Sequence, residues 1–195
     1  MKLTINICTV PSRVAQLSKL VSHINSQSLP VLQINYLGDN MVMSIGEKRN
    51  WLMAMSRGEY VCYVDDDDQV DNLFVKRILD GIRSGKDVIC YGVKISLNGG
   101  PLRPVDYSIH NDHLNSINRY SRKPNHLMVW RRDLVKDVPF DDTSMGEDTI
   151  WATKVTALAT SEHKINEHLY TYHADRSKSE SVRRNIRDHR LRRED

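Results

Sequence analysis

The chain has 195 residues, of which 39% are hydrophobic and 27% charged, with a formal net charge of +3. These values are typical of a soluble globular protein with one domain and a single core. No apolar run approaches the roughly 20 residues that span a bilayer, and the N-terminus lacks an apolar signal core, so we expect a cytoplasmic protein. Cys8, Cys62 and Cys90 each lie in an expected strand without metal-type spacing, which predicts buried, reduced thiols.

The first half of the chain alternates between strand-like and helix-like segments. Apolar and β-branched runs predict strands at residues 3–10, 31–37, 60–64 and 88–91. The segments between them have apolar residues at helical spacing, with Ser12, Ser44 and Asp71 as expected N-caps and with Gly58 and Gly85 ending the second and third helices. Ser44 and Glu47 have the spacing of a capping box. This alternation predicts a parallel α/β sheet with helices on both faces and all strand C-termini along one edge.

The second half is less regular. Residues 102–126 follow neither the strand nor the helix period, which predicts a long loop of functional use. Strand character returns at residues 127–130 and again at residues 169–173. Between these strands, a helix is expected to begin at Asp148, with Ile150, Trp151, Val155 and Leu158 on its inner face. At that spacing, Trp151 is expected in the core.

Four consecutive carboxylates, residues 65–68, directly follow the third expected strand. Neighbouring carboxylates repel each other by about a kcal/mol per close pair even in high dielectric, so the run needs a cation. Mg²⁺ and Mn²⁺ prefer such oxygen ligands, and the C-terminal strand edge is where open α/β sheets bind ligands. The sequence therefore predicts a divalent metal site, with a solvated acidic loop that caps the next helix as the alternative.

The excess positive charge lies at the C-terminus. Residues 176–195 contain eight Lys or Arg and four acids, a net +4 that leaves about −1 for the rest of the chain. We therefore expect a main domain over residues 1–175 and a basic tail over residues 176–195. Four tail arginines share one helical face that would suit phosphate contacts, namely Arg183, Arg184, Arg187 and Arg190. A disordered or membrane-proximal tail is the alternative.

Five motifs in register resemble a family 2 glycosyltransferase of the GT-A fold. They are Thr9-Val-Pro-Ser-Arg13, Gly46-x-Lys48-Arg49-Asn50, Gly58-Glu-Tyr-Val61 with the acidic run, Gly146-Glu147-Asp148, and His173. The resemblance spans about residues 3–175 and is greatest to short single-domain members found in phages and in surface-polysaccharide gene sets. It implies a GT-A (Rossmann-like), mostly parallel sheet in a single domain. It also implies a metal-dependent, inverting transfer of one sugar from a nucleotide diphosphate sugar, with a UDP-sugar favoured, to an acceptor hydroxyl.

The resemblance assigns roles to the acidic run and to the late histidine. Asp65 would hold the ribose side of the nucleotide, with Asp66 as the alternative in the register. Asp67 would ligate Mn²⁺ or Mg²⁺, and His173 would reach back to the metal or the diphosphate. Asp68 could instead belong to the following turn, and a purely structural role is the alternative for His173.

The other donor-binding candidates lie after the first strand, after the second strand and on the capped helix. They are Thr9, Pro11, Ser12, Arg13, Asp39, Lys48 and Arg49. Thr9 could reach the nucleobase, and Asp39 loosely matches the acid that reads the base in the family. Lys48 and Arg49 lie on the first turns of a helix, where an anionic ligand is favoured, although an exposed basic face is the alternative.

An inverting transfer needs one carboxylate to deprotonate the acceptor hydroxyl. Asp148 is the candidate base, at the position of the family's Glu-Asp pair, and Glu147 is the alternative acid. Since Asp148 lies at a helix N-terminus, a capping role is the competing interpretation.

The acceptor follows less directly. We hypothesise a hydroxymethylated pyrimidine in phage DNA, bound partly through the basic tail, in which case the protein would act in the host cytoplasm. A surface polysaccharide or a lipid-linked glycan is the alternative acceptor. Because transmembrane helices and the Gln-x-x-Arg-Trp motif of processive family members are absent, a single sugar transfer is expected. The Asp66-Asp-Asp-Gln-Val70 segment also resembles a phosphohydrolase motif, so a metal-dependent phosphohydrolase is a second alternative, although such enzymes carry the motif on their first strand.

Overall fold

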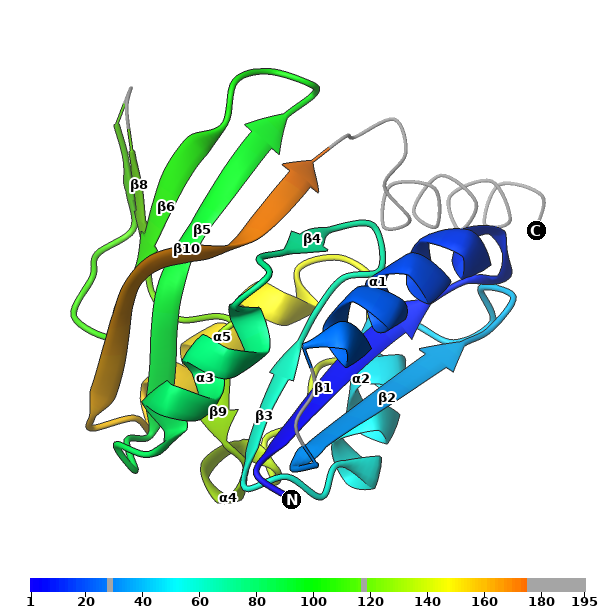
Figure 1. Ribbon diagram of the computed structural model, residues 1–195, viewed down its shortest axis with the longest axis horizontal. Coiled ribbons are helices and arrows are strands. Elements are labelled where there is room, and N and C mark those ends of the chain that lie inside the picture. Colours follow the sequence, from blue (N-terminus) through cyan, green and yellow to red (C-terminus); the bar gives the residue numbers. More distant parts are fainter. Residues whose placement is uncertain (28–29, 117–118, 175–195) are drawn as a thin grey trace, which may run out of the picture.

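The computed structural model describes residues 1–27, 30–116 and 119–174 (Figure 1). The expected basic tail, including Arg183, Arg184, Arg187 and Arg190, lies outside the described residues. The division into a main domain and a tail therefore stays a prediction.

The N-terminal part of the sheet is parallel, as expected. Strand β1 (Leu3–Thr9) pairs in parallel with β2 (Leu32–Gly38) on one side and with β3 (Tyr60–Tyr63) on the other. Every residue of β3 is buried, in keeping with its unbroken apolar and aromatic sequence. The carboxyl ends of β1 and β3 thus lie side by side, and the acidic run of residues 65–68 follows directly.

The whole sheet is mixed rather than purely parallel. The order of its main path is β2-β1-β3-β9-β5-β6-β8-β7, and β10 pairs with β4 and β5. Strand β9 lies antiparallel between β3 and β5, which keeps β5 parallel to β3. The remaining strands are β4 (Gln69–Val70), β5 (Val88–Leu97), β6 (Arg103–Tyr107), β7 (Leu114–Asn115), β8 (Tyr120–Arg122), β9 (Val129–Arg131) and β10 (Glu162–Ala174).

Helices cover both faces of the sheet, as predicted for an α/β fold. In Figure 1, α1 (Val14–Ser26) and α3 (Phe74–Ile82) lie on the near face, and α2 (Ile45–Met55) and α5 (Glu147–Thr156) lie on the far face. A short helix, α4 (Arg132–Val135), follows β9. The core between these layers contains Leu52, Phe74, Trp130 and Trp151, each at most 1% exposed.

One predicted N-cap is confirmed and two are wrong. The Ser44 hydroxyl accepts a hydrogen bond from the Glu47 N–H at the start of α2. Ser12 instead lies in a 3-10 turn, η1 (Pro11–Arg13), and α1 begins after Arg13 without a side-chain cap. Asp71 lies three residues before α3, and its side chain accepts a hydrogen bond from the N–H of Leu73, so it shapes the turn rather than capping the helix.

Some predicted helix boundaries and inner faces are also wrong. Helix α2 ends at Met55, three residues before Gly58. On α5, Trp151 and Val155 are buried, whereas Ile150 and Leu158 are 41% and 45% exposed. The Trp151 ring stacks on Phe140 at 4.6 Å, which confirms its place in the core.

The irregular segment at residues 102–126 is not a single loop. It contains β6, β7 and β8, which extend the sheet beyond β5. These strands are short and the segment's Pro, Asn and His residues interrupt the alternation of apolar and polar residues, so the sequence pattern did not predict them. The last strand, β10, runs from Glu162 to Ala174 and is longer than the predicted residues 169–173, with register shifts along its pairing with β5.

The cysteine prediction holds for two of the three residues. Cys62 and Cys90 are fully buried, and burial raises the pKa of both thiols. Cys8 is only partly buried and lines the pocket described below.

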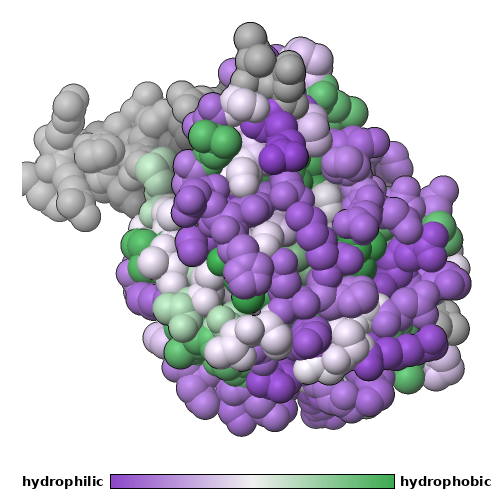
Figure 2. All heavy atoms as spheres, turned by 90° about the vertical axis from the view of Figure 1, so that its left-hand side faces the viewer, coloured by the Kyte–Doolittle hydropathy of each residue, from purple (hydrophilic) through white to green (hydrophobic). Residues whose placement is uncertain are grey.

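The face beside β6 and β8 is mostly hydrophilic. Figure 2 shows this side of the molecule, with hydrophobic side chains in small separate groups. Within the described residues, no helix has the length and apolar character needed to cross a membrane.

Candidate active site

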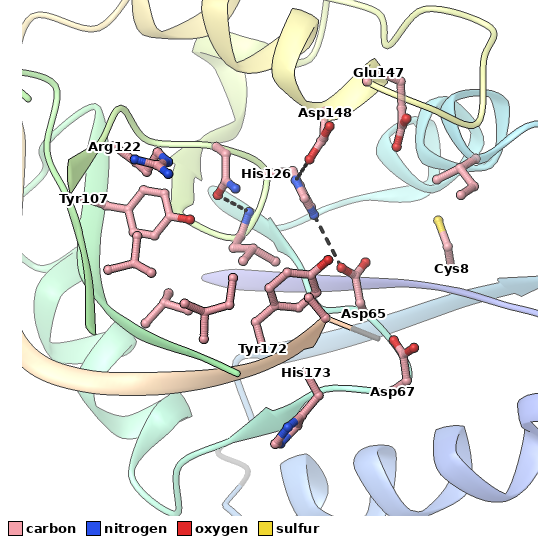
Figure 3. Close-up of a pocket in the computed structure, with 18 of the residues that line it drawn as sticks. Cys8, Asp65, Asp67, Tyr107, Arg122, His126, Glu147, Asp148, Tyr172 and His173 are labelled. Carbon is pink, nitrogen blue, oxygen red and sulfur yellow. Dashed lines mark hydrogen bonds and ion pairs between the residues drawn. The ribbon is translucent and has the colours of Figure 1, made fainter. Parts of the chain in front are cut away.

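A pocket of about 600 Å³ opens where the acidic run, α2 and the start of α5 meet. Its lining includes Arg13, Asp65, Asp67 and Asp148, which come from three separate segments of the chain. Figure 3 shows the last three of these residues around the pocket. The structure therefore brings several of the residues predicted to bind a donor, together with the residue predicted to act as a base, into one cavity.

Arg13 links two carboxylates of the acidic run. Its guanidinium donates to Asp66 at 2.7 Å and to Asp67 at 2.9 Å. Asp66 is 3% exposed and also accepts a hydrogen bond from the Thr9 hydroxyl at 2.7 Å, whereas the Asp67 side chain is 38% exposed. Burial raises the pKa of Asp66, although Thr9 and Arg13 oppose this shift. The Arg13 guanidinium thus supplies part of the positive charge that the acidic run needs, which the sequence predicted to come from a metal ion.

Asp68 faces away from the pocket, toward β10. It accepts hydrogen bonds from the Tyr170 hydroxyl at 2.7 Å and from the backbone N–H of His173 at 3.0 Å. Burial, together with nearby Asp65, raises the pKa of Asp68 well above the ordinary range. Asp68 therefore attaches the acidic run to the last strand. From the sequence, Asp68 was expected only to belong to the following turn.

Asp65 faces the pocket and is held by two basic residues. One of its oxygens lies 3.5 Å from Arg49, and the other lies 3.7 Å from Nε2 of His126. Burial would raise the pKa of Asp65, but its basic neighbours, among them Arg49 and Arg13, outweigh this effect and hold the pKa below its ordinary range. Asp65 is therefore ionised at neutral pH.

Arg49 joins α2 to α5 through a buried ion pair with Glu147 at 2.8 Å. Burial would lower the pKa of Arg49, but the carboxylates around it, led by Asp65, outweigh burial and raise the pKa above its ordinary value. Both members of the pair are nearly inaccessible, with Glu147 4% exposed. Burial raises the pKa of Glu147, while the Arg49 charge opposes this effect. Glu147 thus has a positioning role in this geometry.

Gly46 allows α2 to approach the segment before α5. A Cβ atom on Gly46 would lie 1.9 Å from the carbonyl oxygen of Asp141. The backbone N–H of Gly46 donates to the Thr143 carbonyl, and that of Ile45 donates to the Ser144 hydroxyl. These contacts set the spacing between Arg49 and Glu147.

Asp148 is the accessible member of the acidic pair. Its side chain is 35% exposed and lines the pocket, and one oxygen lies 3.7 Å from Nδ1 of His126. The other oxygen accepts a hydrogen bond from the Thr149 N–H at 2.7 Å. The N-cap residue of α5 is Gly146 rather than Asp148, so Asp148 is not the helix cap and its partly exposed carboxylate faces the pocket.

Lys48 and Asp39 pair with each other away from solvent. Lys48 is fully buried, and its ammonium group contacts Asp39 at 2.5 Å and the Thr9 carbonyl at 2.9 Å. The second Asp39 oxygen accepts hydrogen bonds from the N–H groups of Val42 and Met43. Burial would raise the pKa of Asp39, but Lys48 and these amides lower it. In this geometry both residues organise the loop after β2, and the alternative of an exposed basic face is wrong for Lys48 and for Arg49.

The other predicted residues divide into two groups. Pro11 and Ser12 are exposed at the carboxyl end of β1, on the same edge as Arg13. The ring of His173 is exposed and points away from Asp65 and Asp67 in Figure 3. The backbone N–H of His173 donates a hydrogen bond to Asp68. The structure therefore does not bring the His173 ring to the predicted metal ligand.

Two features of the pocket were missed from the sequence. One is His126, which lay at the end of the segment interpreted as a loop. The other is the half of the pocket beyond Asp148, which contains Val93, Val105, Tyr107 and Tyr172 from β5, β6 and β10. The alternating apolar residues of β5 were the available signal for this second feature.

The sheet order, the helices on both faces and a pocket at the carboxyl ends of β1 and β3 define a GT-A-like fold. Residues 44–134 match the family model described as glycosyl transferase family 2. No curated protein matches the sequence.

Solved structures of TarS from S. aureus share the fold. TarS 1-349 in complex with UDP-GlcNAc superposes with a TM-score of 0.72 at 17% identity, covering 94% of this chain and 61% of that one. The complex with UDP gives 0.69 at 18% identity, with 90% and 61% covered. The chain thus spans about three fifths of these two TarS 1-349 chains. Together, the family model and the fold confirm the resemblance to a family 2-like, GT-A glycosyltransferase.

Proposed function

We propose that this protein is a glycosyltransferase that moves one sugar from a UDP-sugar to an acceptor hydroxyl. The observation that carries the proposal is the meeting of Asp65, Asp67 and Asp148 at one pocket in a GT-A fold. The solved structures with this fold include TarS complexes with UDP and with UDP-GlcNAc, which supports a uridine diphosphate sugar as the donor class.

The acidic run suits a metal that the donor helps to bind. Asp67 and Asp65 offer carboxylate oxygens at the pocket, but no group of three His, Cys, Asp or Glu residues that could hold a metal occurs in the described part of the chain. Mg²⁺ commonly binds through one or two carboxylates plus substrate phosphates, so these residues fit such a shared site, occupied by Mn²⁺ or Mg²⁺. A bound ion would stabilise the negative charge of the departing diphosphate.

Asp148 is our proposed general base. It accepts the proton of the acceptor hydroxyl while that oxygen bonds to the anomeric carbon of the sugar. The bond from this carbon to the diphosphate breaks on the opposite face, and UDP leaves with the electron pair, so the configuration inverts. The accessibility of Asp148, compared with the buried and paired Glu147, supports this choice.

The half of the pocket beyond Asp148 supports an acceptor with a flat, partly apolar face. Val93 and Val105 form apolar walls, while Tyr107 and Tyr172 add aromatic rings, and Arg122 lies nearby. A hydroxymethylated pyrimidine taken out of a DNA stack has such a face, and aromatic side chains commonly receive bases this way. The basic tail at residues 176–195 would then contact phosphates. Because sugar rings also pack on tyrosines, a surface polysaccharide or lipid-linked glycan is the second candidate acceptor.

The phosphohydrolase alternative has less support. Its nucleophile would be Asp66, which is 3% exposed and engaged by Thr9 and Arg13, and its second acid would be Asp68, which faces Tyr170.

The test combines a panel of UDP-sugars and Mn²⁺ or Mg²⁺ with DNA that contains hydroxymethylcytosine, matched unmodified DNA, and a glycan panel. Labelling of the modified DNA alone is expected, with a steep loss on salt addition that truncation at residue 175 makes shallower. Labelling of a glycan instead would overturn the acceptor and keep the transferase. The absence of any UDP-sugar binding or slow hydrolysis would overturn the proposed function.

The base has its own test. Asp148→Asn should keep the donor dissociation constant and lower transfer by about 100- to 10,000-fold. The matched control is Asp142→Asn, an exposed aspartate six residues earlier that should behave as wild type. Full activity in Asp148→Asn would show that another residue is the base.

A further inference from the structure

His126 occupies a fixed and nearly inaccessible position in the pocket wall. Its side chain is 5% exposed, and its backbone carbonyl accepts a hydrogen bond from the N–H of Tyr63 at 3.0 Å. The ring edge also packs against the Tyr63 ring, with centroids 6.4 Å apart. Because β3 holds it in this way, the ring has little freedom to leave the site.

The ring lies between Asp65 and Asp148 (Figure 3). Its Nε2 atom is 3.7 Å from Asp65, and its Nδ1 atom is 3.7 Å from Asp148. It is the side chain that spans the donor-side carboxylate and the proposed base among the residues that the structure describes.

Arg49 determines which ring nitrogen carries the proton. An Arg49 nitrogen lies 3.1 Å from Nε2, and a guanidinium group can only donate, so Nε2 accepts. In the neutral ring, the proton is then on Nδ1. Nδ1 is buried and has no hydrogen-bond partner within the described residues, although it faces the Asp148 carboxylate. Leaving a buried N–H without a hydrogen-bond acceptor costs free energy, so a movement of the Asp148 carboxylate toward Nδ1 is favourable.

We propose that His126 is a positioning residue that orients the Asp148 carboxylate for proton transfer. In the resting geometry the 3.7 Å separation is too long for a hydrogen bond, and a small movement of the partly exposed Asp148 side chain closes it. The Nδ1–H then binds one oxygen of Asp148, the Thr149 N–H holds the other, and a remaining lone pair of the oriented carboxylate accepts the proton of the acceptor hydroxyl. Through Nε2, the same ring responds to Arg49 and Asp65, so the orientation of the base depends on the donor side of the pocket. This inference rests on the proposed glycosyl transfer.

Two substitutions separate orientation from simple packing. His126→Asn keeps an amide donor close to the place of Nδ1, whereas His126→Gln keeps one near the place of Nε2. We expect His126→Gln to lower kcat for transfer by about 10- to 100-fold, and His126→Asn to retain kcat within a few-fold. The donor dissociation constant and the thermal unfolding midpoint should be similar in the two variants. In the Asp148→Asn background, the two substitutions should no longer differ.

Other results overturn the inference. If His126→Gln keeps the wild-type kcat, or if both variants lose kcat and donor affinity equally, His126 has a structural role only.

A measurement on the free protein does not depend on turnover. Nitrogen-15 and carbon-13 NMR of the histidine rings should show His126 with its proton on Nδ1, assigned by comparison with His126→Asn. Asp148→Asn should shift the Nδ1 resonance, and Asp142→Asn should not. A proton on Nε2 overturns the proposal even in an active enzyme. If wild-type protein with the expected NMR signature shows no sugar transfer, the proposed function fails while the contact between His126 and Asp148 stands.

Discussion

Arg49 and Glu147 form a buried ion pair across 98 residues of sequence, with 2.8 Å between a guanidinium nitrogen and a carboxylate oxygen. The pair joins the first turns of α2 to the first turn of α5, and so places Asp148 beside the acidic run. An arginine predicted to bind phosphate thus assembles the pocket from the two halves of the chain.

Loss of this pair should be costly. Glu147→Gln leaves the Arg49 charge buried with a weaker partner, and we expect a fall in the free energy of unfolding of about 3 kcal/mol. Urea unfolding measures this change. The control is Glu59→Gln, which removes an exposed pair with Lys2 and should cost under about 1 kcal/mol. Equal losses in the two variants would show that burial of the Arg49 pair adds nothing to stability.

Gly46→Ala should disturb the same junction from the backbone side. Since its Cβ would lie 1.9 Å from the Asp141 carbonyl oxygen, α2 must move away from the segment before α5. We expect a loss of about 1–3 kcal/mol in stability and a lower rate of UDP-sugar turnover.

Gly85→Ala is the comparison for that prediction. Gly85 has a φ of +66° and open space around it, so alanine there strains only a distant turn. It should lower the unfolding midpoint but leave the turnover of folded protein unchanged. A Gly46→Ala enzyme with wild-type turnover would contradict the role given to this close approach.

Removal of Arg13 should increase the response to divalent ions. Arg13→Gln leaves Asp66 and Asp67 without the guanidinium that contacts both, so a cation binding there gains more from their charge. We expect millimolar Mn²⁺ to raise the thermal midpoint of Arg13→Gln more than that of wild type, with EDTA reversing the gain. Arg57→Gln, on an exposed residue, is the control. The same Mn²⁺ response in all three proteins would count against a metal at Asp67.

Asp87 should contribute to stability in a pH-dependent way. Burial would raise its pKa, but hydrogen bonds from Thr160 and Ser161 and the charge of Arg131 lower it. Because its folded-state pKa is below the unfolded value of about 4, this stabilisation is present above about pH 4 and is lost as the pH falls further. Asp87→Asn should therefore be less stable than wild type at pH 7, with the difference shrinking below about pH 4.

Urea unfolding at a series of pH values from about 7 to 2.5 tests this dependence. Asp112→Asn, on an exposed loop residue, should follow the wild-type profile. A constant difference between Asp87→Asn and wild type across the series would exclude the proposed linkage.

Much of the framework follows from local sequence patterns. The strands β1, β2 and β3, the helices α1 and α2 between them and the Ser44 cap depend on neighbouring residues, so periodicity and capping chemistry reveal them. The placement of Asp65 and Asp67 at the ligand-binding edge of the sheet also follows, because parallel strands end together. The placement of Asp148 does not, since it depends on the packing of α5 against α2. The short strands β6, β7 and β8 do not, since their pairing depends on β5 and on each other rather than on their own pattern.

By itself, the sequence determined the class of fold and the location of the acidic run after a buried strand. The tertiary structure alone decided what each carboxylate does. Asp66 and Asp67 both pair with Arg13, and Asp68 accepts a hydrogen bond from β10. Asp65 and Asp148 lie on either side of His126. Four identical side chains in a row carry no local signal that separates them. Their roles depend on partners tens of residues away in the chain, which only the packing of the folded chain brings close to them.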